Sequence, residues 1–222
     1  AQAFNALQQR LASAWQRERT FVDGVAHELR TPIAVISAQA QRLLPEGASH
    51  SSGSAPALMA SEADRMGELV RVLMDFARSD SGRLQLSTEV VDPELLLVEV
   101  YERLLPLAPS RLQLAPAAQQ LLPQIQVDSE RVHQCLAALV DNALKYSSKT
   151  VTLCCDVSQN RVMLHVRDAG PGIPPHERDA VLERFARGSA AIGTRGSGIG
   201  LATVSMLMQA MNGELLIADQ PG

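Results

Sequence analysis

The sequence is poor in aromatic residues and in long apolar runs, and it has no excess of basic charge. Phe, Trp and Tyr make up 3% of the 222 residues, which favours aliphatic packing between helices over an aromatic-rich β-sandwich. Apolar runs such as 136–140 are far shorter than the roughly 20 residues that span a bilayer. The formal net charge of −4 argues against the basic surface of nucleic-acid-binding proteins, so we expect no nucleic acid partner.

Cysteine is also scarce, and its pattern excludes a disulfide framework. The three cysteines, Cys135, Cys154 and Cys155, cannot all pair, and their spacing matches no zinc site. Cys154 and Cys155 are consecutive in a strand-like run, so we expect their side chains on opposite faces of a sheet. We interpret all three as reduced thiols that pack as small hydrophobic residues.

The first part of the chain has the pattern of a helical hairpin. Apolar residues recur at helical spacing over 4–44 and again over 59–76, and a stretch rich in Ser, Gly, Ala and Pro at 45–56 separates them. Two such helices cannot bury both apolar stripes alone, so we expect a homodimer in which two hairpins form a four-helix bundle. We assign residues 1–82 to this dimerising hairpin.

Residues 83–222 mix strands and helices in an order typical of an α+β domain with helices on one face of a sheet. We expect strands at 84–90, 151–157, 161–167 and 214–218, and helices at 93–105, 129–146, 175–185 and 198–211. Asp92 before Pro93 is a typical helix start, and Asp128 is the expected N-cap of the next helix. A Pro-rich stretch at 106–123 lies between these two helices.

His27 is a candidate nucleophile on the first helix. It lies about 200° around the helix from the apolar Val25 and Leu29, so its side chain faces water. Thr31 lies one turn further on, and Glu28 can accept the imidazole Nδ1 proton, which leaves Nε2 with a lone pair for attack. An ordinary solvated helical histidine has the same pattern, and this segment alone leaves that alternative open.

Two segments of the second part carry residue types that suit a bound nucleotide. Asn142 and Lys145 share one face of a helix, where an amide oxygen suits Mg²⁺ and an ammonium can neutralise phosphate. Asp168 follows an apolar strand and precedes Gly170 and Gly172, and its carboxylate can accept a hydrogen bond from an adenine amino group. Separately, these segments also fit a helix end and a turn.

A glycine-rich segment opens the helix expected at 198–211. Gly196, Gly198 and Gly200 let backbone N–H groups approach phosphate oxygens, and a helix N-terminus favours anions. The segment has neither the GK[ST] ending of a P-loop nor the spacing and flanking strand of a dinucleotide fingerprint. Alone it also fits a flexible linker.

The order of these elements resembles that of the sensor histidine kinases of two-component systems. Residues 27–32 resemble their H box, 142–145 the N box, 168–172 the G1 box, 183–187 the F box and 196–201 the G2 box. Five boxes in this order cover nearly the whole chain. The resemblance implies a dimerisation and phosphotransfer hairpin at 1–82, followed at 83–222 by a Bergerat-type α/β sandwich that binds ATP.

The family pattern also implies residue roles. His27 would take the γ-phosphoryl group of ATP with Glu28 as general base, and Thr31 matches the pattern linked to dephosphorylation of the regulator. Asn142 would hold Mg²⁺. The residues implied to contact ATP are Asn142, Lys145, Tyr146, Asp168, Gly170, Gly172, Arg187, Gly196, Gly198, Gly200 and Leu201. The phosphoryl group would then pass to an aspartate of a response regulator.

Some features depart from the family pattern, and two alternative functions stay open. Ala138 stands where the N box often carries an earlier Asn, and the chain ends where the family usually continues into a last strand. Residues 3–7 resemble the end of a HAMP linker, so we expect the cytoplasmic part of a protein anchored upstream in a bacterial inner membrane. The alternatives are another Bergerat-fold ATPase, against which His27 argues, and a catalytically silent dimeric signalling scaffold.

Overall fold

The computed structural model describes residues 2–42, 55–116, 121–191 and 196–218. The chain divides into two compact units, Ala1–Asp80 and Ser81–Gly222. Within the described residues, none of the helices combines the length and the hydropathy needed to cross a membrane.

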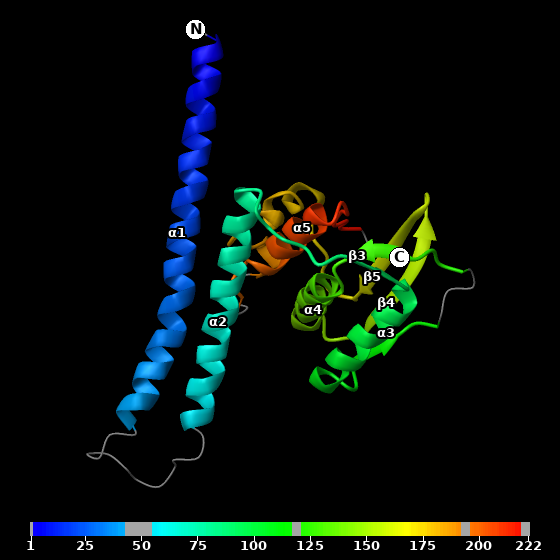
Figure 1. Ribbon diagram of the computed structural model, residues 1–222. Helices are drawn as coiled ribbons and strands as arrows, with labels where there is room; N and C mark the ends of the chain where they lie inside the picture. The colour runs from blue at the N-terminus through cyan, green and yellow to red at the C-terminus, as the bar shows by residue number, and fades with distance from the viewer. Residues whose placement is uncertain (1, 43–54, 117–120, 192–195, 219–222) are drawn as a thin grey trace. The chain divides into compact units, whose positions relative to one another are not determined.

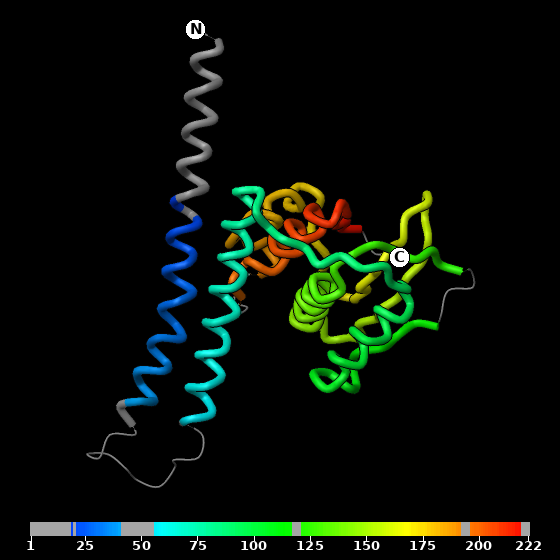
Figure 2. The backbone as a smooth tube through the Cα atoms, viewed as in Figure 1, coloured from blue at the N-terminus to red at the C-terminus, as the bar shows by residue number. Residues whose placement is uncertain are grey.

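The first unit is a hairpin of two long helices. Helix α1 (Gln2–Arg42) and helix α2 (Ala55–Asp80) lie side by side and antiparallel (Figures 1 and 2). Phe76 and Val72 of α2 are buried, and so is Pro32, which lies inside α1 without ending it. Gly82 follows α2 with φ +65°, the left-handed conformation with which helices commonly end. The expected hairpin is therefore present.

The second unit contains a three-stranded sheet in the order β2-β4-β5. Strand β4 (Val151–Ser158) pairs with β2 (Leu112–Leu114) in parallel and with β5 (Arg161–Arg167) antiparallel. Gln159 and Asn160 both have positive φ and close the β4–β5 hairpin, as a type I′ turn requires. Two short strands, β1 (Glu89–Val91) and β3 (Ile125–Val127), form a separate antiparallel pair.

Helices α3 (Pro93–Leu104) and α4 (Ser129–Tyr146) pack on the sheet, and α5 (Gly200–Ala210) packs on α4. The core between helices and sheet is aliphatic and comprises Leu96, Leu97, Val100, Leu112, Val132, Leu136, Val140, Ala143, Val151 and Leu153. The α+β class with a helical hairpin ahead of an α/β unit is therefore confirmed, and this core supports the ends of α4 and β5.

The cysteines have packing roles in this unit. Cys155 packs against the core, whereas Cys154 lies directly across from His165 of β5, so the two thiols occupy opposite faces as expected. Burial raises the pKa of the Cys135 thiol to about 12 and the pKa of Cys155 to about 11. Both are therefore protonated, unreactive thiols near neutral pH.

Both predicted aspartate caps are confirmed. Asp92 accepts hydrogen bonds from the backbone N–H groups of Glu94 (2.9 Å) and Leu95 (3.4 Å) at the start of α3. Asp128 accepts one from Arg131 N (3.1 Å) at the start of α4, and its other oxygen accepts from Ser87 N (2.8 Å). Asp128 thus caps a helix and also ties it to the segment before β1.

Several predicted elements are wrong. Pairing with β3 limits the strand expected at 84–90 to Glu89–Val91, and the Pro-rich stretch contains strand β2. The helix expected at 175–185 is two short 3₁₀ turns, η3 (Pro175–Glu177) and η4 (Ala180–Leu182), because Glu183 is extended and Phe185 has φ +63°. Residues 214–218 form no strand with any described residue.

Candidate functional site

The candidate nucleophile lies on the open face of α1. His27 and Thr31 are exposed, while Val25 and Leu29 on the opposite side are half-buried. This arrangement agrees with the helical phase inferred from the sequence. The imidazole of His27 is therefore accessible to a partner molecule or domain.

The neighbouring carboxylate makes a contact that the sequence did not indicate. Glu28 Oε2 lies 3.5 Å from Nη2 of Arg65 on α2, and the Glu28 side chain is only 15% exposed. Arg65 also lies 3.8 Å from Oε2 of Glu62, one turn earlier on α2. Arg65 is 37 residues from Glu28, so no local pattern could have revealed this pair.

In the second unit, the end of α4 meets the glycine-rich segment. A Cβ at Gly196 would collide with the Lys145 ammonium nitrogen, so the lysine occupies the space that this glycine leaves open. The same nitrogen lies 5.3 Å from the ring centroid of Tyr146, within the range of a cation–π interaction. The N box and the G2 box, about fifty residues apart in the sequence, thus meet where the Lys145 ammonium lies against Gly196.

The loop after β5 also packs on the end of α4. The backbone N–H of Gly170 donates to Asp168 Oδ1 at 2.6 Å. A Cβ at Gly170 would lie 2.8 Å from Asp168 Oδ1 and 3.1 Å from the Tyr146 carbonyl oxygen, so this turn packs closely against both residues. Gly172 has φ +70°, a backbone conformation that glycine adopts without strain. Asp168 and Tyr146 are therefore parts of one packed region.

Just before α5, the backbone of Gly198 lies close to the backbone of Phe185. Gly198 has φ +70°, and a Cβ there would lie 2.7 Å from the carbonyl carbon of Phe185. Gly200 is the first residue of α5, and Ile199 at the N-cap position provides no side-chain hydrogen bond. Among the described residues the N-cap position thus leaves the N-terminal amides of α5 without a side-chain cap, an arrangement that favours an anion. Leu201 follows and is half-buried.

Arg187 and Asn142 complete the set of predicted contact residues. Arg187 is exposed and donates to the Ala191 carbonyl, just before residues 192–195, which lie outside the described chain. Asn142 is half-buried on α4, one turn before Lys145. Beside Arg187, Ser189 donates its backbone N–H to Glu177 Oε2 at 2.9 Å, and the hydrogen bonds from Ser189 lower the pKa of Glu177.

Arg111 is a further residue that supports this site without any local sequence pattern. Its guanidinium donates to the carbonyls of Leu144 (3.1 Å), Ser147 and Lys149 (3.4 Å) at the C-terminal end of α4. The last carbonyls of a helix have no backbone donor within that helix, and a cation beside them also complements the helix dipole. Arg111 therefore fixes the turn that carries the predicted contact residues of α4.

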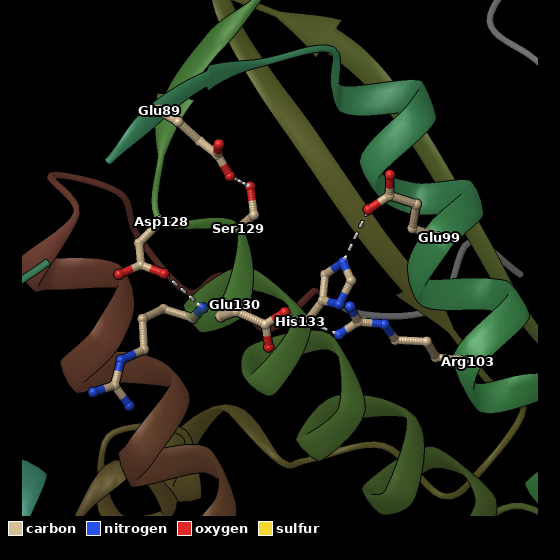
Figure 3. Close-up of polar contacts among 8 residues, drawn as sticks. Glu89, Glu99, Arg103, Asp128, Ser129, Glu130 and His133 are labelled. Atoms are coloured by element: carbon tan, nitrogen blue, oxygen red, sulfur yellow. Dashed lines mark hydrogen bonds and ion pairs between the residues drawn. The ribbon is translucent and has the colours of Figure 1, made fainter. Parts of the chain in front are cut away.

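His133 lies apart from this cluster, buried between α3 and α4 (Figure 3). Neither ring nitrogen has a hydrogen-bond partner among the described residues, and Nε2 lies 3.8 Å from Glu99 Oε2. Burial lowers the pKa of His133, and the nearby Arg103 lowers it further, while Glu130 and Glu99 oppose the shift. The folded chain thus disfavours protonation of this histidine.

Two family models match the chain. The model described as "His Kinase A (phospho-acceptor) domain" matches residues 17–82, and the model described as "Histidine kinase-, DNA gyrase B-, and HSP90-like ATPase" matches residues 127–222. Together they cover more than half of the chain. Their order is the order in which His27 and the glycine-rich segments occur.

Curated relatives and a solved structure agree with these models. The sensor histidine kinase YkoH of Bacillus subtilis strain 168 is 30% identical over 223 residues, which are 99% of this chain and 48% of YkoH. The histidine-protein kinase/phosphatase MprB of Mycobacterium leprae strain TN is 31% identical over 228 residues, which are 98% of this chain and 43% of MprB. Full-length ShkA in complex with AMPPNP matches with a TM-score of 0.62 and 32% identity, over 88% of this chain and 41% of ShkA.

The chain thus spans less than half the length of these relatives. The resemblance inferred from the five boxes is confirmed by both family models and by relatives that match nearly the whole chain. The chain belongs to the sensor histidine kinases, with a phospho-acceptor hairpin domain followed by an ATP-binding domain of the histidine kinase, gyrase B and HSP90 type.

Proposed function

We propose that this chain is the catalytic part of an ATP-dependent histidine autokinase. Residues 1–82 present His27 as the phosphoryl acceptor and residues 83–222 bind ATP. The observation that carries this proposal is that one chain joins an exposed histidine on a helical hairpin to a glycine-rich helix start that contacts Lys145. A silent scaffold needs neither feature.

The second unit has groups suited to each part of ATP. The ammonium of Lys145 and the uncapped amides at the start of α5 can bind the phosphates. The carboxylate of Asp168 can accept from the adenine amino group, and Tyr146 can cover the nucleotide. Gly170 packs against the Tyr146 carbonyl and Gly198 against the Phe185 backbone, which holds these two turns beside the proposed ATP-binding groups. Arg187 is proposed to reach the phosphate tail.

Asn142 is the proposed Mg²⁺ ligand. Mg²⁺ prefers oxygen ligands, keeps several waters, and is usually held by one or two protein oxygens together with substrate phosphates. An amide oxygen on α4 one turn from Lys145 fits that donor set, and among the described residues no cluster of His, Cys, Asp or Glu forms a metal cage. Bound Mg²⁺ would supply neutralisation of phosphate charge.

The reaction at His27 requires mainly positioning. The lone pair of His27 Nε2 forms a bond to the γ-phosphorus while the bond from that phosphorus to the bridging oxygen breaks, and ADP leaves with that electron pair. The Nδ1 proton passes to Glu28, so the ring phosphorylated at Nε2 does not carry a positive charge. The phosphoryl group then moves from Nε2 to a regulator aspartate. Thr31, one turn away, is proposed to help orient a water that hydrolyses the regulator's aspartyl phosphate, which would be the dephosphorylating activity.

Apolar side chains on the hairpin support a dimer. Large hydrophobic residues of α1 and α2 are about half exposed in the single chain: Val22 (55%), Ile33 (49%), Leu58 (47%), Val70 (45%) and Met74 (50%). Surfaces of this kind mark interaction sites, and pairing with a second copy would bury them in a four-helix bundle. We therefore propose that the active species is a homodimer and that a response regulator is its partner.

Incubation with radiolabelled ATP and Mg²⁺ tests the proposal. The dimer should acquire a phosphoryl group that is stable in base and labile in acid, as expected for phosphohistidine. His27→Gln should abolish this label, whereas the control His176→Gln, which removes another exposed histidine, should retain it. Label that persists in His27→Gln would contradict the assignment.

A second variant separates ATP chemistry from assembly. Asn142→Ala should lose Mg²⁺-dependent labelling while light scattering still reports a dimer. Undiminished labelling in this variant would refute the proposed metal role.

A further inference from the structure

Arg65 on α2 lies between two carboxylates that belong to different helices of the hairpin. Its guanidinium is 3.5 Å from Glu28 Oε2 on α1 and 3.8 Å from Glu62 Oε2 on α2. Arg65 itself is half exposed, whereas the Glu28 side chain is 15% exposed and the Glu62 side chain 24% exposed. One exposed cation thus serves two carboxylates that are largely shielded from water.

Glu62 is poorly satisfied in this arrangement. Its Oε2 atom is buried and has no hydrogen-bond partner among the described residues, because Arg65 at 3.8 Å is beyond hydrogen-bond reach. A buried carboxylate oxygen without a hydrogen bond is costly, so closer approach of Arg65 to Glu62 would be favourable. Arg65 therefore has an alternative partner within reach.

Glu28 has a competing partner as well. Adjacent residues on a helix point about 100° apart, so the Glu28 carboxylate must turn from α2 toward the exposed side of α1 to reach the His27 ring. Every recorded polar contact of Glu28 with the described residues leads to Arg65, and none leads to His27. In the structure the Glu28 carboxylate contacts Arg65 across the hairpin.

We propose that Arg65 is a positioning residue that restrains histidine phosphorylation. While it pairs with Glu28, the carboxylate cannot take the Nδ1 proton of His27; when Arg65 moves to Glu62, Glu28 is released to do so. This inference rests on the proposed function, in which Glu28 is the base for His27. The Arg65 side chain would thus have two positions, one paired with Glu28 of α1 and one paired with Glu62 of α2.

Neutralising Arg65 and neutralising Glu62 should have opposite effects on the rate of His27 labelling. Arg65→Gln should raise the initial rate of His27 labelling at saturating ATP by about fivefold, the scale of a partly exposed ion pair. Glu62→Gln should lower that rate about as much, because it removes the alternative partner of Arg65. The KM for ATP should stay unchanged in both, since ATP is bound by the other unit. Arg71→Gln, which removes an exposed pair with Glu68 on the same helix, is the matched control.

A measurement independent of ATP accompanies the rates. In ¹H–¹⁵N NMR of the dimer at pH 8.5, Arg65→Gln should increase the fraction of His27 that carries its proton on Nδ1, because the freed Glu28 accepts from that N–H. Glu28→Gln combined with Arg65→Gln should cancel this increase. A merely structural role of Arg65 would change the melting temperature and leave the tautomer ratio unchanged.

The outcomes are distinguishable. A slower or unchanged Arg65→Gln protein with an unchanged tautomer ratio would overturn the role of Arg65. Equal effects of Arg65→Gln and Glu62→Gln, both lowering the rate, would overturn it too. A tautomer shift in a protein that never acquires label would support the Arg65 assignment and overturn the autokinase assignment.

Discussion

The ammonium nitrogen of Lys145 occupies the space in which a Cβ of Gly196 would lie. This contact joins the end of α4 to the glycine-rich segment ahead of α5, two regions that the sequence assigns to the same ligand. It also shows why a side chain at position 196 is excluded while Lys145 remains in place.

Gly196→Ala should therefore weaken ATP binding without unfolding the protein. The methyl group would displace the flexible end of Lys145 from its position, so backbone packing stays intact while the phosphate contact is lost. We expect about a tenfold rise in the dissociation constant for ATP, or roughly 1.4 kcal/mol, measured by titration calorimetry. Gly67→Ala on α2, where a Cβ meets no atom within 4 Å, is the control. Unchanged affinity would show that Lys145 does not bind the phosphates.

Gly198→Ala should instead lower the stability of the folded second unit. Gly198 has φ +70°, and its Cβ would lie against the backbone of Phe185, which cannot move aside as a lysine can. We expect a loss of about 1–3 kcal/mol in the free energy of unfolding of the second unit, from strain at positive φ and from the clash. Urea denaturation followed by circular dichroism measures it. A stability equal to that of the parent protein would mean that the segment relaxes freely.

The sequence predicts the parts of this site better than their mutual contacts. Asp92 and Asp128 mark helix starts correctly because N-capping is local. The strands expected at 151–157 and 161–167 agree with β4 and β5 to within one residue. The contact between Lys145 and Gly196 depends on chain topology. It can be inferred only through the family resemblance, which groups their boxes at one ligand.

The errors have physical causes as well. Strand β2 consists of Leu112–Leu114 alone, too short to show a period within a Pro-rich stretch, and it exists because it pairs in parallel with β4. The pattern at 175–185 is helical, yet the extended Glu183 and the left-handed Phe185 interrupt it where the chain turns toward Gly198. In both places tertiary contacts override the local preference.

Arg111→Met should loosen the end of α4. The substitution keeps a long apolar stem but removes the donors to the carbonyls of Leu144, Ser147 and Lys149. A lost hydrogen bond from a charged group costs about 1.5–3 kcal/mol, so we expect a decrease of that size in the free energy of unfolding. Arg161→Met, which removes an exposed ion pair with Glu214, is the matched control. Hydrogen exchange at 144–149 should rise in Arg111→Met only; equal exchange in both variants would contradict this role.

His133 should make the second unit less stable in mild acid. Its pKa is lowered in the folded chain, so the unfolded chain binds the proton more readily. The free energy of unfolding therefore falls as the pH drops below about 6.5, the unperturbed histidine value, and this contribution levels off below the folded pKa. His133→Leu should reduce the difference in stability between pH 7.5 and pH 5.5, measured by urea denaturation. The exposed His176→Leu should not, and equal pH dependence of the two variants would contradict the inference.

Pro32 removes a backbone hydrogen bond from α1 in the turn that carries His27. Proline has no backbone N–H, so the Glu28 carbonyl, four residues earlier, lacks its helical hydrogen bond although the helix continues. The turn that contains His27 and Glu28 thus lacks one backbone hydrogen bond of a regular helix, while Pro32 itself is buried. A twist applied along α1 would concentrate in this turn, where a small rotation would change the reach of Arg65 to Glu28.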